Sequence, residues 1–147
     1  MESNAAEQLD AIANTRAAVA DRLVTPWWYH PILGLLIAGY VVGMGLGNTA
    51  LRLVTVVLFV AGAAALARAY KSLTGVWVSG FDAGRAGRWA NALGALIGVI
   101  AVAAWLLGSY TELRWPVWPL AAAGLVGTIV LGRRFDSALR AQLRTAG

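Results

Sequence analysis

The strongest constraint on this chain is a set of four long stretches that contain no Asp, Glu, Lys or Arg. The two longest run from Trp27 to Leu51 and from Trp89 to Thr111. Two shorter ones run from Leu53 to Ala67 and from Trp115 to Gly132. With its flanking residues, each approaches the roughly 20 residues that a helix needs to cross a hydrocarbon core of about 30 Å. The pattern predicts an all-α membrane protein.

The composition excludes the common soluble classes. Hydrophobic residues make up 59% of the chain and charged residues 13%, whereas a soluble domain usually carries about 25% charged residues. Cysteine is absent and His30 is the only histidine, so one chain cannot build a thiolate metal site or a bis-histidine haem site. We therefore expect no cofactor and no bound metal.

The expected fold is a four-transmembrane-helix bundle with a cytoplasmic N-terminal amphipathic helix. Its length suits one compact membrane domain with a short appendage at each end. The expected segments are an N-terminal helix at 1–25, a membrane domain at 26–134 with spans at about 30–47, 51–70, 88–109 and 115–132, and a basic tail at 135–147.

The distribution of basic residues predicts the orientation. Ten of the twelve Lys and Arg residues lie before the first span, between the second and third, or after the fourth, and only Arg52 and Arg114 lie on the other side. Positively charged loops stay in the cytoplasm, so both termini should be cytoplasmic. The preference for Arg over Lys, with abundant Ala, Gly and Val, favours a bacterial inner (plasma) membrane. No aromatic–basic surface module accompanies the charge, so no nucleic-acid partner is expected.

The two appendages each allow two interpretations. In the segment 1–25, Leu9, Ile12, Val19 and Leu23 form one stripe that Arg16 interrupts. This is typical of a helix lying on the membrane face, or of a helix that docks on a partner or sister subunit. The tail 135–147 repeats an apolar residue every four positions beside arginines, which suits either binding of anionic lipid or a positive stop signal for the last span.

Small residues recur every four positions on three of the expected spans. This spacing makes a shallow strip that lets two helix backbones approach closely. The strips serve packing within one chain or self-association, and the sequence does not separate these alternatives. The predicted packing residues are Gly39, Gly43, Gly47, Ala90, Gly94, Gly98, Gly124 and Gly132.

The spans lack the ionisable groups that usually mark proton relays and ion-coupled transport. In helix count the chain is similar to the small multidrug transporters, but that family depends on a glutamate in its first helix and none occurs at 30–47. His30, between Tyr29 and Pro31, is expected to be an interfacial residue rather than a catalytic base. The protein is therefore not expected to be an enzyme, unless folding joins His30 or Asp82 to a distant partner.

One segment between the second and third spans, residues 74–88, combines four glycines, aromatic residues and arginines. Glycine N–H groups can face an anion, and arginine can clamp a phosphate with two hydrogen bonds. The segment is either an ordered interfacial turn or a site for an anionic lipid headgroup or a partner. It matches no nucleotide-binding motif. The candidate residues are Trp77, Ser79, Gly80, Arg85 and Arg88.

Three short runs carry a family resemblance: Arg22 to Pro31, Gly75 to Gly80, and Arg133 to Phe135. With these runs the chain resembles small actinobacterial four-span integral membrane proteins of unassigned function. The resemblance implies four helices over nearly the whole chain and no catalytic residues.

The sequence thus predicts a non-catalytic multi-pass protein with an accessory, scaffold or regulatory role. Its expected partners are the lipid bilayer, an anionic lipid, and a second copy or another membrane protein. The alternative is a small transporter or channel subunit that works as a homo-oligomer. Its weakly polar path would be lined by Asn48, Thr49, Thr55, Asn91 and Thr128.

Overall fold

A computed structural model describes residues 2–22, 24–75, 80 and 83–145. These residues form helices and no strand, which confirms the all-α prediction. The elements are α1 (Glu2–Arg22), α2 (Tyr29–Leu46), α3 (Thr49–Thr74), the 3-10 turn η2 (Gly84–Ala86), α4 (Gly87–Tyr110) and α5 (Val117–Thr145).

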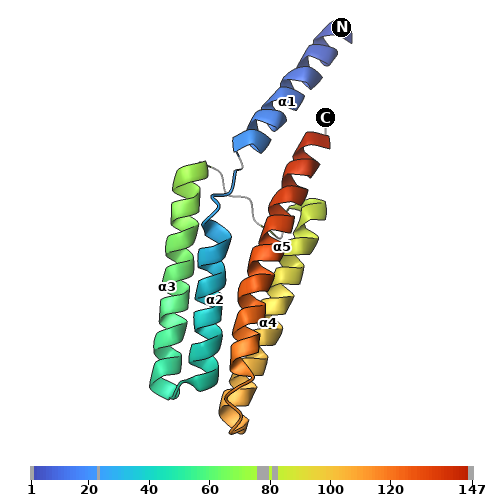
Figure 1. The fold of residues 1–147 in the computed structure, drawn as a ribbon. Helices are drawn as coiled ribbons and strands as arrows, with labels where there is room; N and C mark the ends of the chain where they lie inside the picture. The colour runs from blue at the N-terminus through green and yellow to red at the C-terminus, as the bar shows by residue number, and fades with distance from the viewer. Residues whose placement is uncertain (1, 23, 76–79, 81–82, 146–147) are drawn as a thin grey trace.

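Helices α2 to α5 form an elongated bundle, and α1 projects from one of its ends (Figure 1). Helix α2 is central, because it packs against α3, α4 and α5, whereas α3 packs mainly on α2. We call the end that carries residues 24–28, 75, 80, 83–86 and the last turns of α5 the terminal end. The opposite end, which carries residues 47–48 and 111–116, is the distal end.

The core of the bundle is apolar. Its buried side chains come from α2, α4 and α5, and include Ile37, Val41, Ile100 and Val117. The buried hydroxyl of Thr128 donates a 2.6 Å hydrogen bond to the Gly124 carbonyl of its own helix, so this polar group is satisfied.

Three helical segments of the described chain are long and apolar enough to cross a membrane: α2, α3 and residues 84–110. Helix α5 differs because it joins an apolar half, residues 117–132, to a basic half that begins at Arg133. The helix runs through this change without a break. The segment expected as a fourth span and most of the expected tail are therefore one helix.

At the distal end, polar side chains form hydrogen bonds with the ends of the helices. Asn48 caps α3, because its Oδ1 accepts a 2.9 Å hydrogen bond from the Leu51 N–H. Arg114 Nη1 donates to the Leu46 carbonyl, at the end of α2, at 3.1 Å. Arg52 Nη1 donates to Ser109 Oγ at 2.9 Å, near the end of α4. A positive charge at a helix C-terminus is favourable, so these arginines hold helix ends together.

The small residues of the predicted strips have different surroundings. A Cβ added at Gly43 would meet Thr55 of α3, one at Gly124 would meet Ile37 of α2, and one at Gly132 would meet His30. Gly47 abuts the Gly43 carbonyl in the turn after α2, and Ala90 lies beside Gly80.

A second group of strip residues is exposed. No described atom outside the local backbone lies within 4 Å of a Cβ added at Gly39, Gly94 or Gly98. The α4 pair Gly94 and Gly98 therefore faces away from this chain's own bundle.

Candidate functional site

The terminal end holds a buried histidine–aspartate pair that connects α2 to α5. His30 Nε2 lies 2.6 Å from Asp136 Oδ2, and the two side chains are 9% and 14% exposed. His30 stands in the first turn of α2, just after a turn in which the Tyr29 N–H donates to the Pro26 carbonyl at 3.0 Å. Asp136 lies on α5 just beyond its apolar half.

A glycine lets the two helices come this close. Gly132 lies one helical turn before Asp136, so both residues occupy the same face of α5. A Cβ at Gly132 would collide with the His30 ring. His30 Nδ1 is buried on this side and has no hydrogen-bond partner among the described residues.

The pair borders a cavity of about 190 Å³. Tyr29, Tyr70 and Phe135 supply aromatic rings to its lining, Leu33 and Leu93 supply aliphatic side chains, and Thr25 supplies a hydroxyl. The Tyr29 and Tyr70 ring centroids lie 5.0 Å apart, and Tyr29 meets the His30 ring edge-on at 5.3 Å. The lining also includes Gly80.

The sequence left open that folding joins His30 to a distant partner, but it did not identify Asp136 or this cavity. His30 and Asp136 are 106 positions apart, and the acids of the chain look scattered. One available signal was that Gly132 and Asp136 share a helix face. Another was that the three runs that carry the family resemblance each place residues in this cavity, for example His30, Gly80 and Phe135.

The predicted site in residues 74–88 divides into two places. Gly80 lies at the cavity, beside Ala90 of α4. Arg85 and Arg88 are exposed and line a separate groove of about 610 Å³ between η2, the start of α4 and the end of α5. Trp77 and Ser79, together with Asp82, lie outside the described residues.

The groove has an ordered floor. The Ala86 N–H donates to Gln142 Oε1 at 3.1 Å, which fastens η2 to α5. Gly84 has a left-handed φ of 57° and lies against the Gln142 side chain. The Arg88 guanidinium carbon lies 5.3 Å from the centroid of the Trp89 ring. The two arginines thus lie at a turn that a hydrogen bond fastens to α5, and Trp89 lies beside Arg88.

Among the described residues, helix α1 packs on the bundle through Val19 and Ala20 in its last turns. Ala20 is fully buried, and Val19 packs against the buried cluster that Leu139 shares with Ala83 and Ala86. The Arg144–Asp21 ion pair, at 3.3 Å, is largely exposed and adds little. Farther out, Leu9 is 67% exposed and Ile12 48% exposed. Most of α1 is therefore uncovered.

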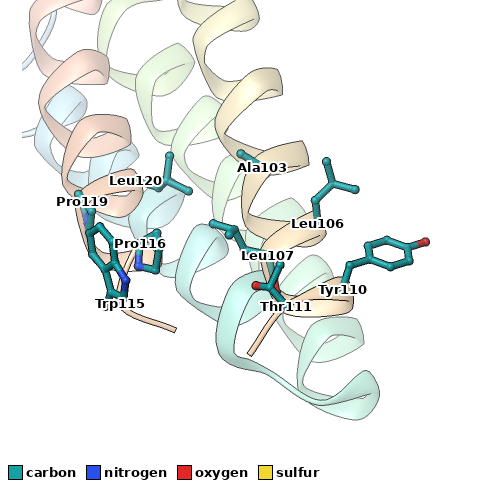
Figure 2. Close-up of a pocket in the computed structure, with 9 residues that line it drawn as sticks. All are labelled: Ala103, Leu106, Leu107, Tyr110, Thr111, Trp115, Pro116, Pro119 and Leu120. Carbon is teal, nitrogen blue, oxygen red and sulfur yellow. The ribbon is translucent and has the colours of Figure 1, made fainter. Parts of the chain in front are cut away.

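The distal end carries an apolar groove of about 740 Å³ between α4 and α5. Figure 2 shows Leu106, Leu107 and Tyr110 of α4 on one side, with Trp115 and Pro116 on the other. The lining is mostly aliphatic and aromatic, and the Thr111 hydroxyl already donates to the Leu107 carbonyl at 2.8 Å, so this groove suits an apolar occupant.

The polar residues expected to line a transport path do not meet in one chain. Asn48 caps α3, Thr55 lies against Gly43, and Thr128 bonds to its own backbone. Thr49 and Asn91 are exposed. Within the described bundle these residues outline no continuous polar path.

Fold and site together define a helical protein with three helices able to span a membrane and a buried histidine–aspartate pair at one bundle end. No family model matches the chain, and no curated protein or solved structure matches it. In the described part of the chain, no group of three or more His, Asp or Glu residues is arranged to hold a metal ion.

Proposed function

We propose that this chain is a four-span, non-catalytic accessory protein of a bacterial inner membrane, which presents α1 to a protein partner in the cytoplasm. The observation that carries the proposal is the projection of α1 from the bundle (Figure 1), with Leu9 and Ile12 uncovered. An isolated helix gains little stability in water, so an uncovered amphipathic helix is best explained by a surface that covers it.

Charge favours a protein over the membrane as the covering surface. On the exposed part of α1, Glu7 and Asp10 outnumber Arg16. Helices that lie on anionic membranes are usually rich in Lys and Arg on their polar face. The acidic helix α1 does not fit that pattern and suits a partner with an apolar groove.

The fourth span in this proposal is the apolar half of α5, residues 117–132. Trp115 and Trp118 lie at its start, where aromatic residues prefer the interface, and Arg133 and Arg134 follow its end. Four crossings put both termini on one side, and the basic residues assign that side to the cytoplasm.

An accessory role fits the bundle better than a transport role does. The core side chains are apolar. Of the polar residues expected to line a path, Asn48 caps α3, Thr128 bonds to its own backbone, Thr55 lies against Gly43, and Thr49 and Asn91 are exposed. A transport path would need buried polar or ionisable groups along the membrane. The buried His30–Asp136 pair lies at one end of the bundle rather than in its middle.

The test is affinity purification of the full chain from native membranes in mild detergent, with mass spectrometry of the proteins that co-purify. The variant Leu9→Ser with Ile12→Ser should lose a stoichiometric partner that the unaltered chain retains. The matched control is Leu113→Ser with Val130→Ser, two exposed apolar residues outside α1, and it should keep the partner. Retention of the partner by the α1 variant would overturn the proposed role of α1.

We further propose that the groove beside Arg85 and Arg88 binds an anionic lipid headgroup. Two guanidinium groups over a fixed turn supply donors to a phosphate, and Trp89 is suited to the interface. In native mass spectrometry, Arg85→Ala with Arg88→Ala should retain less phosphatidylglycerol than the unaltered chain. Arg68→Ala with Arg134→Ala removes the same charge elsewhere and should retain it; equal losses in both variants would contradict a specific site.

A further inference from the structure

The hydrogen bonds of His30 assign its charge. Nε2 lies 2.6 Å from Asp136 Oδ2, so with Asp136 as a carboxylate it is Nε2 that carries the shared hydrogen. Nδ1 is buried and has no acceptor among the described residues. A protonated imidazole would leave a charged N–H donor buried without a partner, which is far more costly than an unpaired neutral nitrogen. The geometry thus favours a neutral His30 with its hydrogen on Nε2.

A neutral His30 leaves the charge of Asp136 uncompensated. Among the described residues, no arginine or lysine forms an ion pair with this carboxylate. Arg140 comes near, but its Nε is 3.4 Å from the backbone carbonyl of Asp136. His30 occupies Oδ2, so Oδ1 remains as a further acceptor. Among the side chains that the structure describes, Asp136 is thus a poorly exposed carboxylate with no Arg or Lys ion-pair partner, and it borders the cavity.

The walls of that cavity suit an organic cation. Tyr29, Tyr70 and Phe135 contribute rings, and aromatic rings attract ammonium groups, most strongly when water is excluded. A volume of about 190 Å³ lies below the roughly 300–1,000 Å³ of sites that take drug-sized ligands. A small substituted ammonium group fits this space, whereas a drug-sized molecule does not.

We propose that the cavity between α2, α3, α4 and α5 binds a small organic ammonium ion, with Asp136 as its counter-charge and the rings of Tyr29, Tyr70 and Phe135 among its walls. His30 positions the carboxylate and does not contact the cation's charge. This site is separate from α1 and from the groove at Arg85, so the proposal is independent of the accessory role.

The test uses the full chain in phosphatidylglycerol nanodiscs, titrated with choline chloride by calorimetry at constant ionic strength. Choline should bind saturably with one site per chain. Its uncharged analogue, in which carbon replaces the quaternary nitrogen, has nearly the same shape and should bind at least about tenfold more weakly. No saturable binding of choline, or equal binding of the two compounds, overturns the proposal.

Two variants locate the site. Asp136→Asn keeps the side-chain size and removes the charge, and should weaken choline binding at least about tenfold. The exposed Asp21→Asn is the matched control and should bind normally. If Asp136→Asn loses its helical circular dichroism, Tyr70→Leu takes its place, because it keeps the charge and removes one ring. Unchanged affinity in a folded site variant overturns the proposal.

The ammonium group can belong to a free amine or to a lipid headgroup, and nanodisc composition separates these sources. If a headgroup is the native occupant, phosphatidylcholine nanodiscs will suppress choline binding, and native mass spectrometry will show phosphatidylcholine on the unaltered chain but not on Asp136→Asn. If a free amine is the occupant, choline will bind equally in both nanodiscs. Both results support the cation site and differ in what fills it.

Discussion

At the scale of single residues, the pair His30 and Asp136 shows how one glycine controls the joining of two helices. Gly132 leaves room for the imidazole ring directly against the α5 backbone. Asp136, one turn farther along, receives the hydrogen on Nε2. The other residues of the terminal end do not predict either of these two contacts.

Gly132→Ala should destabilise the bundle. The added methyl group would overlap the His30 ring, and overpacking of a filled interior costs about 1–3 kcal/mol. Thermal unfolding in detergent, followed by circular dichroism, measures the effect. Gly94→Ala is the control, because no described neighbour lies within 4 Å of its added Cβ. An equal loss in both variants would contradict the tight fit at Gly132.

His30→Ala should also destabilise the fold, by roughly 3 kcal/mol, because it leaves a mostly buried carboxylate without its donor. The double variant His30→Ala with Asp136→Ala removes both polar groups and should recover part of that loss. Reversible unfolding in a detergent series gives the three free energies needed for a double-mutant cycle. Additive losses would show that the two side chains do not interact.

At the scale of helices, the small-residue strips separate into faces that are covered and faces that are open. Gly43 receives Thr55 of α3, whereas Gly94 and Gly98 lie on the exposed face of α4. A four-residue spacing of small residues therefore does not tell which neighbour, if any, lies against a helix.

Because Gly43 is covered and Gly94 is exposed, replacing each by leucine should have different effects. Gly43→Leu should lower the thermal stability of the monomer, because Thr55 occupies the space the side chain would need. Gly94→Leu should leave monomer stability unchanged and should alter oligomer size only if chains associate through α4. Unfolding curves and light scattering in the same detergent distinguish these effects. A large loss of stability in Gly94→Leu would contradict the open face.

Helix type and approximate helix position could be predicted from the sequence, because apolar runs without charge report directly on the helical segments. The length of α5 was harder to predict, because the sequence changes from apolar to basic at Arg133 while the helical backbone continues. The expected cluster of Trp77, Ser79, Gly80, Arg85 and Arg88 was grouped by closeness in sequence. Folding places Gly80 at one site and the two arginines at another.

At the scale of the whole molecule, the number of membrane crossings decides whether the two termini lie on the same side of the membrane. Three helices meet the length and composition of a span, and our proposal adds the first half of α5. If it is right, the distal end faces outward and both termini face the cytoplasm. An odd number of crossings would place the termini on opposite sides.

The absence of cysteine makes this directly testable. Glu112→Cys marks the distal end, and Ser3→Cys and Thr145→Cys mark the two termini. In intact cells, a membrane-impermeant maleimide should label only Glu112→Cys, and lysis should expose the other two. Labelling of one terminus in intact cells would exclude four spans.

The unbroken course of α5 has a mechanical consequence. Its 29 residues span about 43 Å at 1.5 Å per residue, and its one internal proline, Pro119, lies in the first turn, where a proline does not bend a helix. The helix is therefore continuous, with no proline kink between Val117 and Thr145. We expect a displacement of its distal end, for example by a molecule in the apolar groove beside Trp115, to be carried along this helix to the base of α1.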